Sequence, residues 1–374
     1  MLKICLTGGP CAGKTEIFSV LSQTLEERGF HCFRVEEAAT FLILNGIKPS
    51  DNIGMLKFQD FVLDTQLAHE KIFDKLSDFY PTEKIIIFYD RGILDGMAYV
   101  DRATMQELLA KKNMNFADAY NHYDAVLHLV TAANGAEKFY QWNDPSKSDT
   151  GNNAARRESP AEAREKDVRT MEAWVGHPHL RVFDNSTDFA GKTRRVIEEV
   201  FSLLGIPVPK EIERKFLIRK PTPEQLKGLG FLSTTNIIQT YLKSDENTER
   251  RVRQRGTQES GYSFYYTEKT DIGYGERFEK EELISQRKYV ELLAEADTTL
   301  HQIQKTRHCF IYKNRYFELD VYPFSNEYAI MEVEVNDINE EIEMPNLEII
   351  KDVTDDKRFK NHSLAKELRL GIEG

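Results

Sequence analysis

Cysteine, long apolar runs and net positive charge are all lacking in this chain of 374 residues. Its 4 cysteines show no metal-ligand spacing and no disulfide-rich density, which is typical of a protein in the reducing cytoplasm. No uninterrupted apolar run reaches membrane-spanning length, so we expect no transmembrane segment. The first expected strand begins at Leu2, so we also expect no signal peptide.

The charge balance limits the partners of the protein. The chain carries 50 Lys and Arg against 61 Asp and Glu, a formal net charge of −11 at pH 7. Broad nucleic-acid binding needs a net basic surface, so we expect no nucleic-acid partner. The chain is also too long for one typical core. The proline-spaced segment 206–210 predicts a joint between domains at 1–205 and 211–374.

The segment from Gly8 to Thr15 fits the pattern G-x-x-x-x-G-K-[ST], between an apolar run and a helix-patterned stretch. Gly8, Gly9 and Gly13 let backbone N–H groups turn toward phosphate oxygens, and the following helix N-terminus adds positive potential. Lys14 reaches the outer phosphates and Thr15 can ligate Mg²⁺. This context predicts a nucleotide-binding P-loop in a doubly wound parallel α/β sheet.

A second apolar run, residues 84–89, is typical of a buried parallel strand. Asp90 and Arg91 follow this run, at the C-terminal end of the expected strand, where α/β sheets bind ligands. Asp90 can hold Mg²⁺ through water or act as a base toward an acceptor hydroxyl, and Arg91 or Asp95 can contact the acceptor. A strand-end Asp is often only a helix cap, so both interpretations of Asp90 stay open.

Further acids and arginines extend this site. Glu36 and Glu37 end another expected strand, where they can orient a hydroxyl nucleophile or cap the next helix. The long polar stretch 141–157 predicts a lid, which in P-loop kinases supplies arginines to the transferring phosphate. The candidate lid residues are Arg156, Arg157 and Arg164. Surface salt bridges on the following helix would explain these arginines almost as well.

Short strand-like runs from residue 211 to residue 335 alternate charged and apolar residues. Alternate residues of a strand face opposite sides, so Glu213 and Lys215 share one face and Phe216 lies on the other. The cations of the charged positions are Lys215, Arg251, Arg253, Lys269, Arg277, Lys305 and Arg307. The acids are Glu211, Glu213, Glu279, Glu281, Asp320, Glu332 and Glu334.

One such run would indicate an ordinary antiparallel sheet with a solvated face. Several together favour a closed antiparallel barrel whose lumen is ionic, with helices outside at 286–296 and 364–370. Arginine forks and lysine ammonium groups suit a polyanion of several phosphates, and the acids suit Mg²⁺ or Mn²⁺ bridging those phosphates.

The run at residues 211–215 matches the E-x-E-x-K signature of the CYTH family, the triphosphate tunnel metalloenzymes. The later charged runs resemble the following strands of that family in order, and the resemblance covers roughly residues 210–370. It implies that the seven cations hold a triphosphate, that the seven acids hold the metal, and that one carboxylate activates water. Glu211 and Glu213 are the candidate catalytic acids of this domain.

Residues 1–205 resemble a NadR-like P-loop kinase domain, of the group close to nicotinamide riboside kinases and deoxynucleoside kinases. This resemblance implies ATP or GTP as a partner, with Lys14 and Asp90 as candidate catalytic residues. Asn185 to Asp188 lack the lysine of a guanine-reading motif, so the nucleobase preference stays open. The order of the two halves resembles the TRPL translocation defect family, which is associated with nucleotide and phosphoinositide binding in membrane-protein trafficking.

Two hypotheses follow from these patterns. The first is a cytoplasmic bifunctional enzyme, in which the P-loop domain transfers or hydrolyses the γ-phosphate of ATP or GTP. Its α+β tunnel domain would hydrolyse tripolyphosphate, a nucleoside triphosphate or an organic triphosphate with Mg²⁺ or Mn²⁺. The second is a nucleotide-switched adaptor that binds a phosphoinositide or a protein without turnover. The density of acids in line with the cations favours the enzyme.

Overall fold

The computed structural model describes residues 1–50, 53–140, 158–206, 212–245, 248–273, 276–335 and 340–371. They belong to two compact units, Met1–Phe201 and Ser202–Gly374. Most of the predicted joint, together with Glu211, lies outside the described residues. So do Arg156 and Arg157, and nothing is described of the side chains of residues 270–273 and 276–280.

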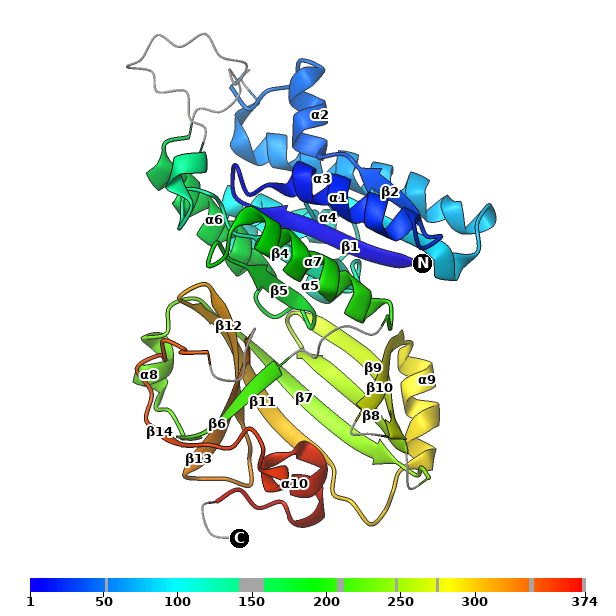
Figure 1. The fold of residues 1–374 in the computed structure, drawn as a ribbon, viewed down its shortest axis with the longest axis vertical. Helices are drawn as coiled ribbons and strands as arrows, with labels where there is room; N and C mark the ends of the chain where they lie inside the picture. The colour runs from blue at the N-terminus through cyan, green and yellow to red at the C-terminus, as the bar shows by residue number, and fades with distance from the viewer. Residues whose placement is uncertain are drawn as a thin grey trace. The chain divides into compact units, whose positions relative to one another are not determined.

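The first unit is built on a parallel sheet. Its described strands are β1 (Leu2–Gly8), β2 (His31–Val35), β3 (Ile85–Asp90), β4 (Ala125–Leu129) and β5 (Leu180–Phe183), in the order β2-β3-β1-β4-β5 (Figure 1). Every residue of β3 before Asp90 is buried, so both faces of the sheet are covered. The chain crosses from β3 to β4 past the central β1, which confirms the predicted doubly wound sheet.

Helices connect these strands. They are α1 (Lys14–Glu26), α2 (Ala38–Leu44), α3 (Gly54–Phe73), α4 (Arg102–Lys111), α5 (Phe116–Tyr120), α6 (Pro160–Trp174) and α7 (Phe189–Leu203). Short 3₁₀-helices are η1 (Asp74–Asp78), η2 (Thr82–Lys84), η3 (Ile93–Ala98) and η4 (Glu137–Phe139). The start of α6 is set locally, because Ser159 and Glu162 form a reciprocal capping box with Pro160 in the first turn.

The second unit is built on an antiparallel sheet. Its described strands are β6 (Ile212–Arg219), β7 (Leu232–Leu242), β8 (Thr248–Thr257), β9 (Gly261–Gly273), β10 (Glu276–Ile284), β11 (Ile303–Tyr312), β12 (Arg315–Val321), β13 (Tyr328–Val335) and β14 (Ile349–Asp352). They pair in the order β10-β9-β8-β7-β11-β12-β13-β6-β14. The predicted antiparallel sheet is confirmed. Pairing between the edge strands β10 and β14 is not found among the described residues, so closure of the barrel stays a prediction.

The two faces of this sheet differ as the alternation predicts. One face carries the apolar residues Phe216, Met331 and Val333 around the stacked rings of Phe310 and Phe317, whose centroids are 5.4 Å apart. The opposite face carries Lys215, Lys305, Arg307, Asp320 and Glu332, and is called the charged face below.

Short helices cover the second sheet. They are α8 (Pro223–Lys227), α9 (Gln286–Leu292) and α10 (Asn361–Glu367), with 3₁₀ turns η5 (Leu293–Glu295) and η6 (Lys357–Phe359). Helix α9 packs through Tyr289 and Leu292 against Val252, on the side of β8 opposite the charged face, as predicted.

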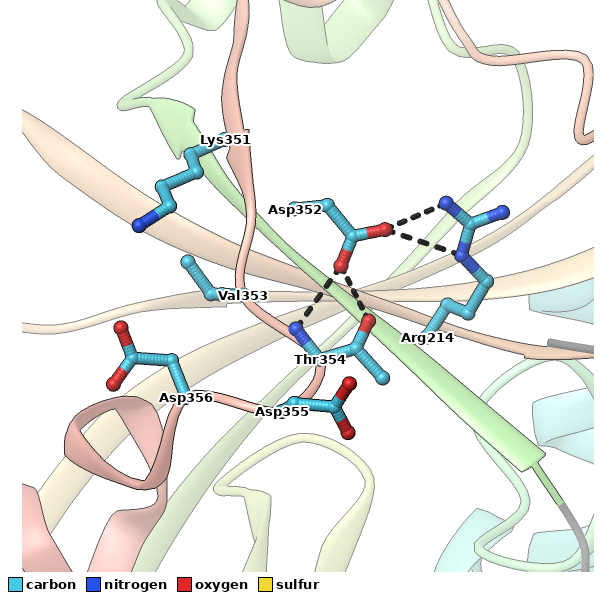
Figure 2. Close-up of a pocket in the computed structure, with 7 residues that line it drawn as sticks. All are labelled: Arg214, Lys351, Asp352, Val353, Thr354, Asp355 and Asp356. Carbon is cyan, nitrogen blue, oxygen red and sulfur yellow. Dashed lines mark hydrogen bonds and ion pairs between the residues drawn. The ribbon is translucent and has the colours of Figure 1, made fainter. Parts of the chain in front are cut away.

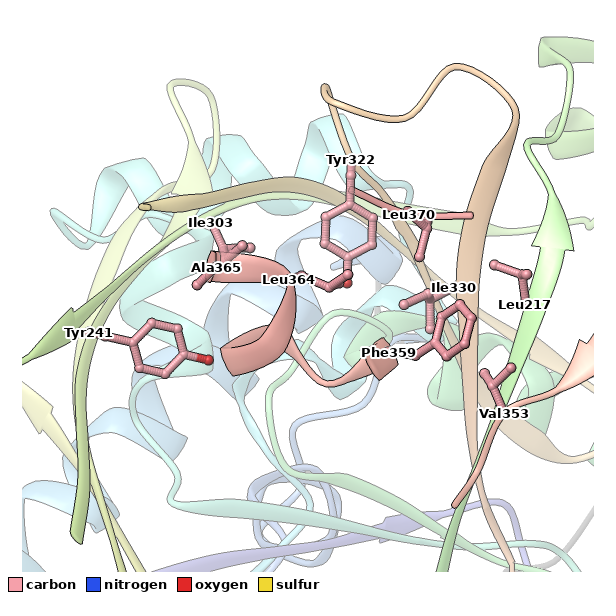
Figure 3. Close-up of a cluster of buried hydrophobic side chains, with 10 residues drawn as sticks. All are labelled: Leu217, Tyr241, Ile303, Tyr322, Ile330, Val353, Phe359, Leu364, Ala365 and Leu370. Atoms are coloured by element: carbon pink, nitrogen blue, oxygen red, sulfur yellow. The ribbon is translucent and has the colours of Figure 1, made fainter. Parts of the chain in front are cut away.

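Helix α10 differs from the prediction. Its residue Leu364 packs in a buried cluster with Leu217, Tyr241, Ile303 and Tyr322 (Figure 3). Strand alternation puts those four residues on the charged face, each two positions from a polar residue of that face. The helix therefore covers part of the charged face and does not lie outside it. The alternating pattern could not show this. It predicts which side chains share a face of a strand, but it does not predict that one face is charged in one part of the strand and apolar in another.

Candidate functional site

The P-loop has the backbone shape that a phosphate site requires. It joins β1 to α1, and φ is positive at Gly8 (140°), Cys11 (55°) and Gly13 (86°). A Cβ at Gly8 would lie 2.1 Å from the carbonyl oxygen of Leu129, so only glycine fits there. Left-handed residues within such a loop turn successive N–H groups toward a common concavity, which attracts anions.

Lys14 and Asp90 lie side by side at the C-terminal edge of the first sheet. The distance from Lys14 Nζ to Asp90 Oδ1 is 4.0 Å, and Arg34 Nη2 donates to Asp90 Oδ2 at 2.6 Å. Burial, and then the charge of Arg91, lower the pKa of Lys14. Asp90 Oδ1 is buried and accepts no hydrogen bond from the described residues. A buried carboxylate oxygen without a hydrogen-bond partner among the described residues, 4.0 Å from Lys14 Nζ, fits an Mg²⁺ ion with its water shell.

Arg91 links the two acidic segments at this edge. It has a positive φ of 75°, a conformation that costs roughly 1–2 kcal/mol for a residue with a Cβ. Its Nε donates to Glu37 Oε1 at 3.0 Å and its Nη1 to Asp95 Oδ2 at 3.3 Å. Glu37 stands at the N-cap of α2 but makes no capping bond through its side chain, and it accepts instead from Arg91 and Thr40. The structure thus brings Glu37, Arg91 and Asp95 together, while Glu36 is exposed.

Asp95 is less available to an acceptor than the sequence predicts. It is buried and accepts from Thr7 Oγ1 at 2.6 Å and from Trp174 Nε1 at 2.7 Å, besides its contact with Arg91. With both carboxylate oxygens engaged, Asp95 fixes Arg91 in place. Glu37 and Arg91 are then the groups that can contact an acceptor.

Helix α6 contacts the P-loop directly. Asp167 accepts a hydrogen bond from the Gly9 N–H at 2.6 Å, and His128 Nε2 lies 3.2 Å from the same carboxylate oxygen. Arg164, the one described residue of the three lid candidates, donates to the Ala133 carbonyl at 2.8 Å. Arg164 therefore holds the loop after β4. Its predicted contact with a transferring phosphate stays a prediction.

Asp320 is the centre of the charged face in the second unit. It is fully buried and accepts from Arg307 Nε at 2.7 Å, from Arg307 Nη2 at 2.6 Å and from Lys305 Nζ. Burial opposes its ionisation, but Arg307 and Lys305 hold the pKa of Asp320 below its usual range. Both oxygens of Asp320 are occupied by these cations. Asp320 therefore orients Arg307 and Lys305, and it has no oxygen left over for a metal ion.

Glu332 connects this centre to β6. Its Oε2 lies 3.1 Å from Arg307 Nη2, and its other oxygen pairs with Lys215 Nζ. Arg307 belongs to β11 and Glu332 to β13, so the sheet brings together side chains from strands that are not neighbours. Burial opposes ionisation of Glu332, but Lys215 and Arg307 lower its pKa well below the usual range. Glu332 is therefore an anion at neutral pH.

Glu213 forms no ion pair with a described residue, whereas Asp320 and Glu332 each pair with two cations. Desolvation and the neighbouring Glu332 carboxylate raise the pKa of Glu213 to about 8, although its exposed position lets water screen part of this effect. Glu213 also stands opposite Glu334 in the strand register. Like charges placed this way destabilise a sheet, and a divalent cation would offset their repulsion.

The acids near Glu213 fit a divalent cation only in part. Among the described residues, no three His, Cys, Asp or Glu are grouped closely enough to hold a metal by themselves. Mg²⁺ commonly takes one or two carboxylates and completes its shell with substrate phosphates and water. Glu213 could supply one of those carboxylates, and Glu332 the other only if a metal replaced Lys215 or Arg307 at one of its oxygens. Glu211 lies outside the described residues.

A second ion pair lies farther along the charged face. Arg253 Nη2 donates to Glu281 at 2.9 and 2.7 Å, and Thr267 Oγ1 donates to the same carboxylate at 2.9 Å. Burial lowers the pKa of Arg253. Arg251 lies 3.9 Å from Glu249, and Lys269 stands two residues beyond Thr267 on the same face. The side chains of Arg277 and Glu279 lie outside the described residues.

Several residues of these sites escaped the sequence analysis. They are Arg34, Asp167, Arg255 and Glu318. Arg255 continues the alternation of Arg251 and Arg253, and Glu318 that of Asp320, so both could have been found from spacing. Arg34 and Asp167 carry no such signal, because their partners are far away in the sequence.

A pocket of about 470 Å³ beside β14 contains none of the predicted site residues. It is lined by Arg214 and residues 351–356 (Figure 2). Asp352 accepts there from Arg214 Nη2 at 2.6 Å and from Thr354 Oγ1 at 2.5 Å. Through these contacts, the Asp352 carboxylate stabilises the local structure around Arg214 and Thr354. The charged face therefore remains the candidate site of the second unit.

Two family models match the chain. Residues 3–192 match the model described as AAA domain, and residues 209–361 match the model described as CYTH domain. No curated protein sequence matches. In the described residues, no helix is both long and apolar enough to cross a membrane.

Solved structures similar to this chain include the inorganic triphosphatase NE1496. It is 28% identical, with 42% of this chain and 96% of that chain covered and a TM-score of 0.32. A second structure of the same protein, described as hypothetical protein NE1496, is 29% identical over 42% of this chain and 98% of that one, with a TM-score of 0.31. The PH1819 protein from Pyrococcus horikoshii OT3 is 20% identical over 35% and 81%, with a TM-score of 0.28.

The Asp320 cluster predicts a large effect of one substitution on stability. Asp320→Asn removes the charge that Lys305 and Arg307 share in a buried site, so it should destabilise the second unit by about 3–5 kcal/mol. Urea unfolding of the full chain measures this change. Glu327→Gln is the matched control, because Glu327 is exposed and lies 3.5 Å from the exposed Arg219, and it should cost less than about 1 kcal/mol. Equal effects of the two substitutions would contradict the assignment.

Proposed function

We propose that this chain, which belongs to the AAA-domain family through its N-terminal unit and carries a CYTH domain in its C-terminal unit, is a metal-dependent enzyme with two phosphate sites. The observation that carries the proposal is the charged face, where Lys215, Lys305 and Arg307 are gathered around two buried acids. Arg307 also pairs with Glu318, and Glu213 lies near Glu332, so acids are interleaved with the cations of this group. Interleaved cations and acids at this density suit an anion of several phosphates bound together with a divalent cation.

We assign hydrolysis of a linear triphosphate to the charged face. Lys215, Lys305, Arg307, Arg251 and Arg253 would bind the phosphate oxygens, and a linear substrate would extend along the strands that carry them. Glu213 and Glu332 would hold Mg²⁺ or Mn²⁺, which when bound neutralises developing charge on the phosphates. An acid of this group would accept a proton from the attacking water. The water oxygen then bonds to the terminal phosphorus while the anhydride bond breaks, and orthophosphate leaves.

We assign nucleotide binding to the first unit, with transfer or hydrolysis of the γ-phosphate. The loop N–H groups and Lys14 would hold the phosphates of ATP or GTP, and Thr15 and Asp90 would hold Mg²⁺. Glu37 is within reach of an acceptor hydroxyl on the same edge of the sheet, and Arg91 can orient the acceptor. The ordered Glu37–Arg91 pair supports a kinase over a simple nucleoside triphosphatase, because hydrolysis needs no acceptor contact.

Replacement of the two metal-site acids tests the tunnel assignment. Glu213→Gln with Glu332→Gln removes both carboxylates that would hold the metal, so Mg²⁺-dependent phosphate release from tripolyphosphate should fall by at least about 100-fold. The matched control is Glu327→Gln with Glu348→Gln, which removes two exposed acids near Arg219 and should leave the rate unchanged. Full activity of the first double variant, with or without Mg²⁺, would contradict the scheme.

Replacement of Lys14 tests the P-loop assignment independently. Lys14→Ala should weaken binding of Mg²⁺·ADP and Mg²⁺·GDP by at least about tenfold in calorimetry, because the loop lysine contacts the phosphates. Hydrolysis of tripolyphosphate by the same variant should stay at the wild-type rate. Lys111→Ala, on the exposed side of α4, is the control for loss of a lysine charge. Undiminished binding of both nucleotides to Lys14→Ala would remove the P-loop from the proposed function.

A further inference from the structure

The carbonyl groups of three consecutive P-loop residues accept hydrogen bonds from the structure behind the loop. The pairs are Thr131 Oγ1 with Pro10 O, Ala132 N–H with Cys11 O at 3.3 Å, and Lys192 Nζ with Ala12 O at 3.4 Å. In a planar trans peptide the carbonyl and the following N–H point in opposite directions, and the described chain has no cis peptide bond. The three contacts therefore turn the next three N–H groups away from the protein interior, toward the mouth of the loop.

These contacts hold a backbone shape that the loop would not keep by itself. Cys11 has a φ of 55°, which costs a residue with a side chain roughly 1–2 kcal/mol. Strained backbone of this kind persists only where its surroundings fix it. The surroundings here come from the segment after β4 and from α7. The phosphate-binding N–H groups are thus pre-arranged before a nucleotide arrives, which removes an ordering cost from binding.

Lys192 differs from the other two donors because it carries a charge. It is 2% exposed, and its ammonium group also donates to Val130 O at 2.8 Å and to Asn185 Oδ1 at 2.9 Å. All three partners are neutral oxygens, and within the described part of the chain Lys192 forms no ion pair. A buried ammonium group without a carboxylate in contact leaves its positive charge directly behind the loop.

We propose that Lys192 is a positioning residue of the phosphate site. Its ammonium group fixes and polarises the peptide between Ala12 and Gly13, so that the Gly13 N–H is a stronger donor to a bound phosphate. Its charge adds to the potential of the loop from the side opposite Lys14. Lys192 acts through the backbone and does not touch the nucleotide. This inference rests on the proposed binding of nucleotide phosphates at the P-loop.

The charge of Lys192 should make nucleotide affinity depend on pH. Burial lowers the pKa of Lys192 to about 8, which Asp167 of α6 and Asp184 after β5 raise and Arg195 of α7 lowers. A bound phosphate stabilises the charged form, so binding is strongest where Lys192 is protonated. Affinity should therefore fall as the pH rises through about 8.

Calorimetry of the full chain with Mg²⁺·ADP and Mg²⁺·GDP tests the proposal, at about pH 7 and about pH 9. Both nucleotides lack the triphosphate that the second unit is proposed to take. Lys192→Met keeps the length of the side chain without its charge, and should lose at least about tenfold in affinity at the lower pH. Its affinity should decline less with pH than that of the wild type, because only Lys14, whose pKa burial also lowers, then remains as a titrating lysine of the site. Lys192→Arg keeps a charge that does not titrate in this range, so it should bind at both pH values.

Thr131→Val is the matched control for a purely structural contact. It removes the uncharged donor to Pro10 O, so it should weaken binding and keep the wild-type decline with pH. If Lys192→Met does not fold, the comparison of wild type with Lys192→Arg decides, because the lowered pKa of Lys14 affects both proteins equally and the wild type should lose more affinity at the higher pH. A wild-type affinity that is flat with pH would overturn the proposal.

The outcome with Lys14→Ala separates this inference from the proposed function. If Lys14→Ala loses nucleotide binding and Lys192→Met binds like the wild type at the lower pH, the role of Lys192 fails and the P-loop assignment stands. If Lys14→Ala also binds like the wild type, the P-loop assignment itself fails and the inference fails with it.

Discussion

The contact between Asp320 and its two cations is the interaction on which the second unit depends. A sheet that gathers Lys305 and Arg307 in its interior cannot fold with those charges unopposed, because each buried charge costs several kcal/mol. Asp320 and Glu332 supply the opposing charge before any substrate is present. Under the proposed function, a triphosphate would have to compete with these carboxylates for the same donors. A divalent cation at Glu213 and Glu332 would lower that competition, which explains why acids and cations are interleaved on one face.

The first unit, in the proposed function, binds phosphate mainly through the dipoles of backbone N–H groups and not through a buried cluster of charges. Its proposed phosphate site presents backbone N–H groups, which are dipoles and need no counter-charge, and the carbonyl ends of those peptides accept hydrogen bonds from the structure behind the loop. Lys14 and Asp90 are the charged pair at the mouth, 4.0 Å apart, and Arg91 is restrained by Glu37 and Asp95. Chemistry at this edge needs little rearrangement of the loop, whereas the charged face must exchange its internal partners for substrate and metal.

The sequence was sufficient wherever one local rule decides the outcome. The glycine spacing predicts the P-loop, and strict alternation predicts that Lys215 and Glu332 share a face, as they do. It was insufficient where a contact joins distant segments. In the sequence, Lys192 is indistinguishable from any exposed lysine of a helix, and only the fold places it next to Ala12. Nothing in the sequence predicts that Asp167 accepts a hydrogen bond from Gly9. Helix α10 was expected outside the sheet, because alternation cannot show that the charged face turns apolar near Tyr322.

The most direct test of the central claim is binding of tripolyphosphate and of pyrophosphate to the full chain, by calorimetry with Mg²⁺ at low and high salt. If the cations of the charged face are arranged for three linked phosphates, tripolyphosphate should bind at least about tenfold more tightly than pyrophosphate. Its affinity should weaken as salt rises, because the attraction is between charges. Equal affinity for the two anions, or affinity that does not respond to salt, would contradict the account.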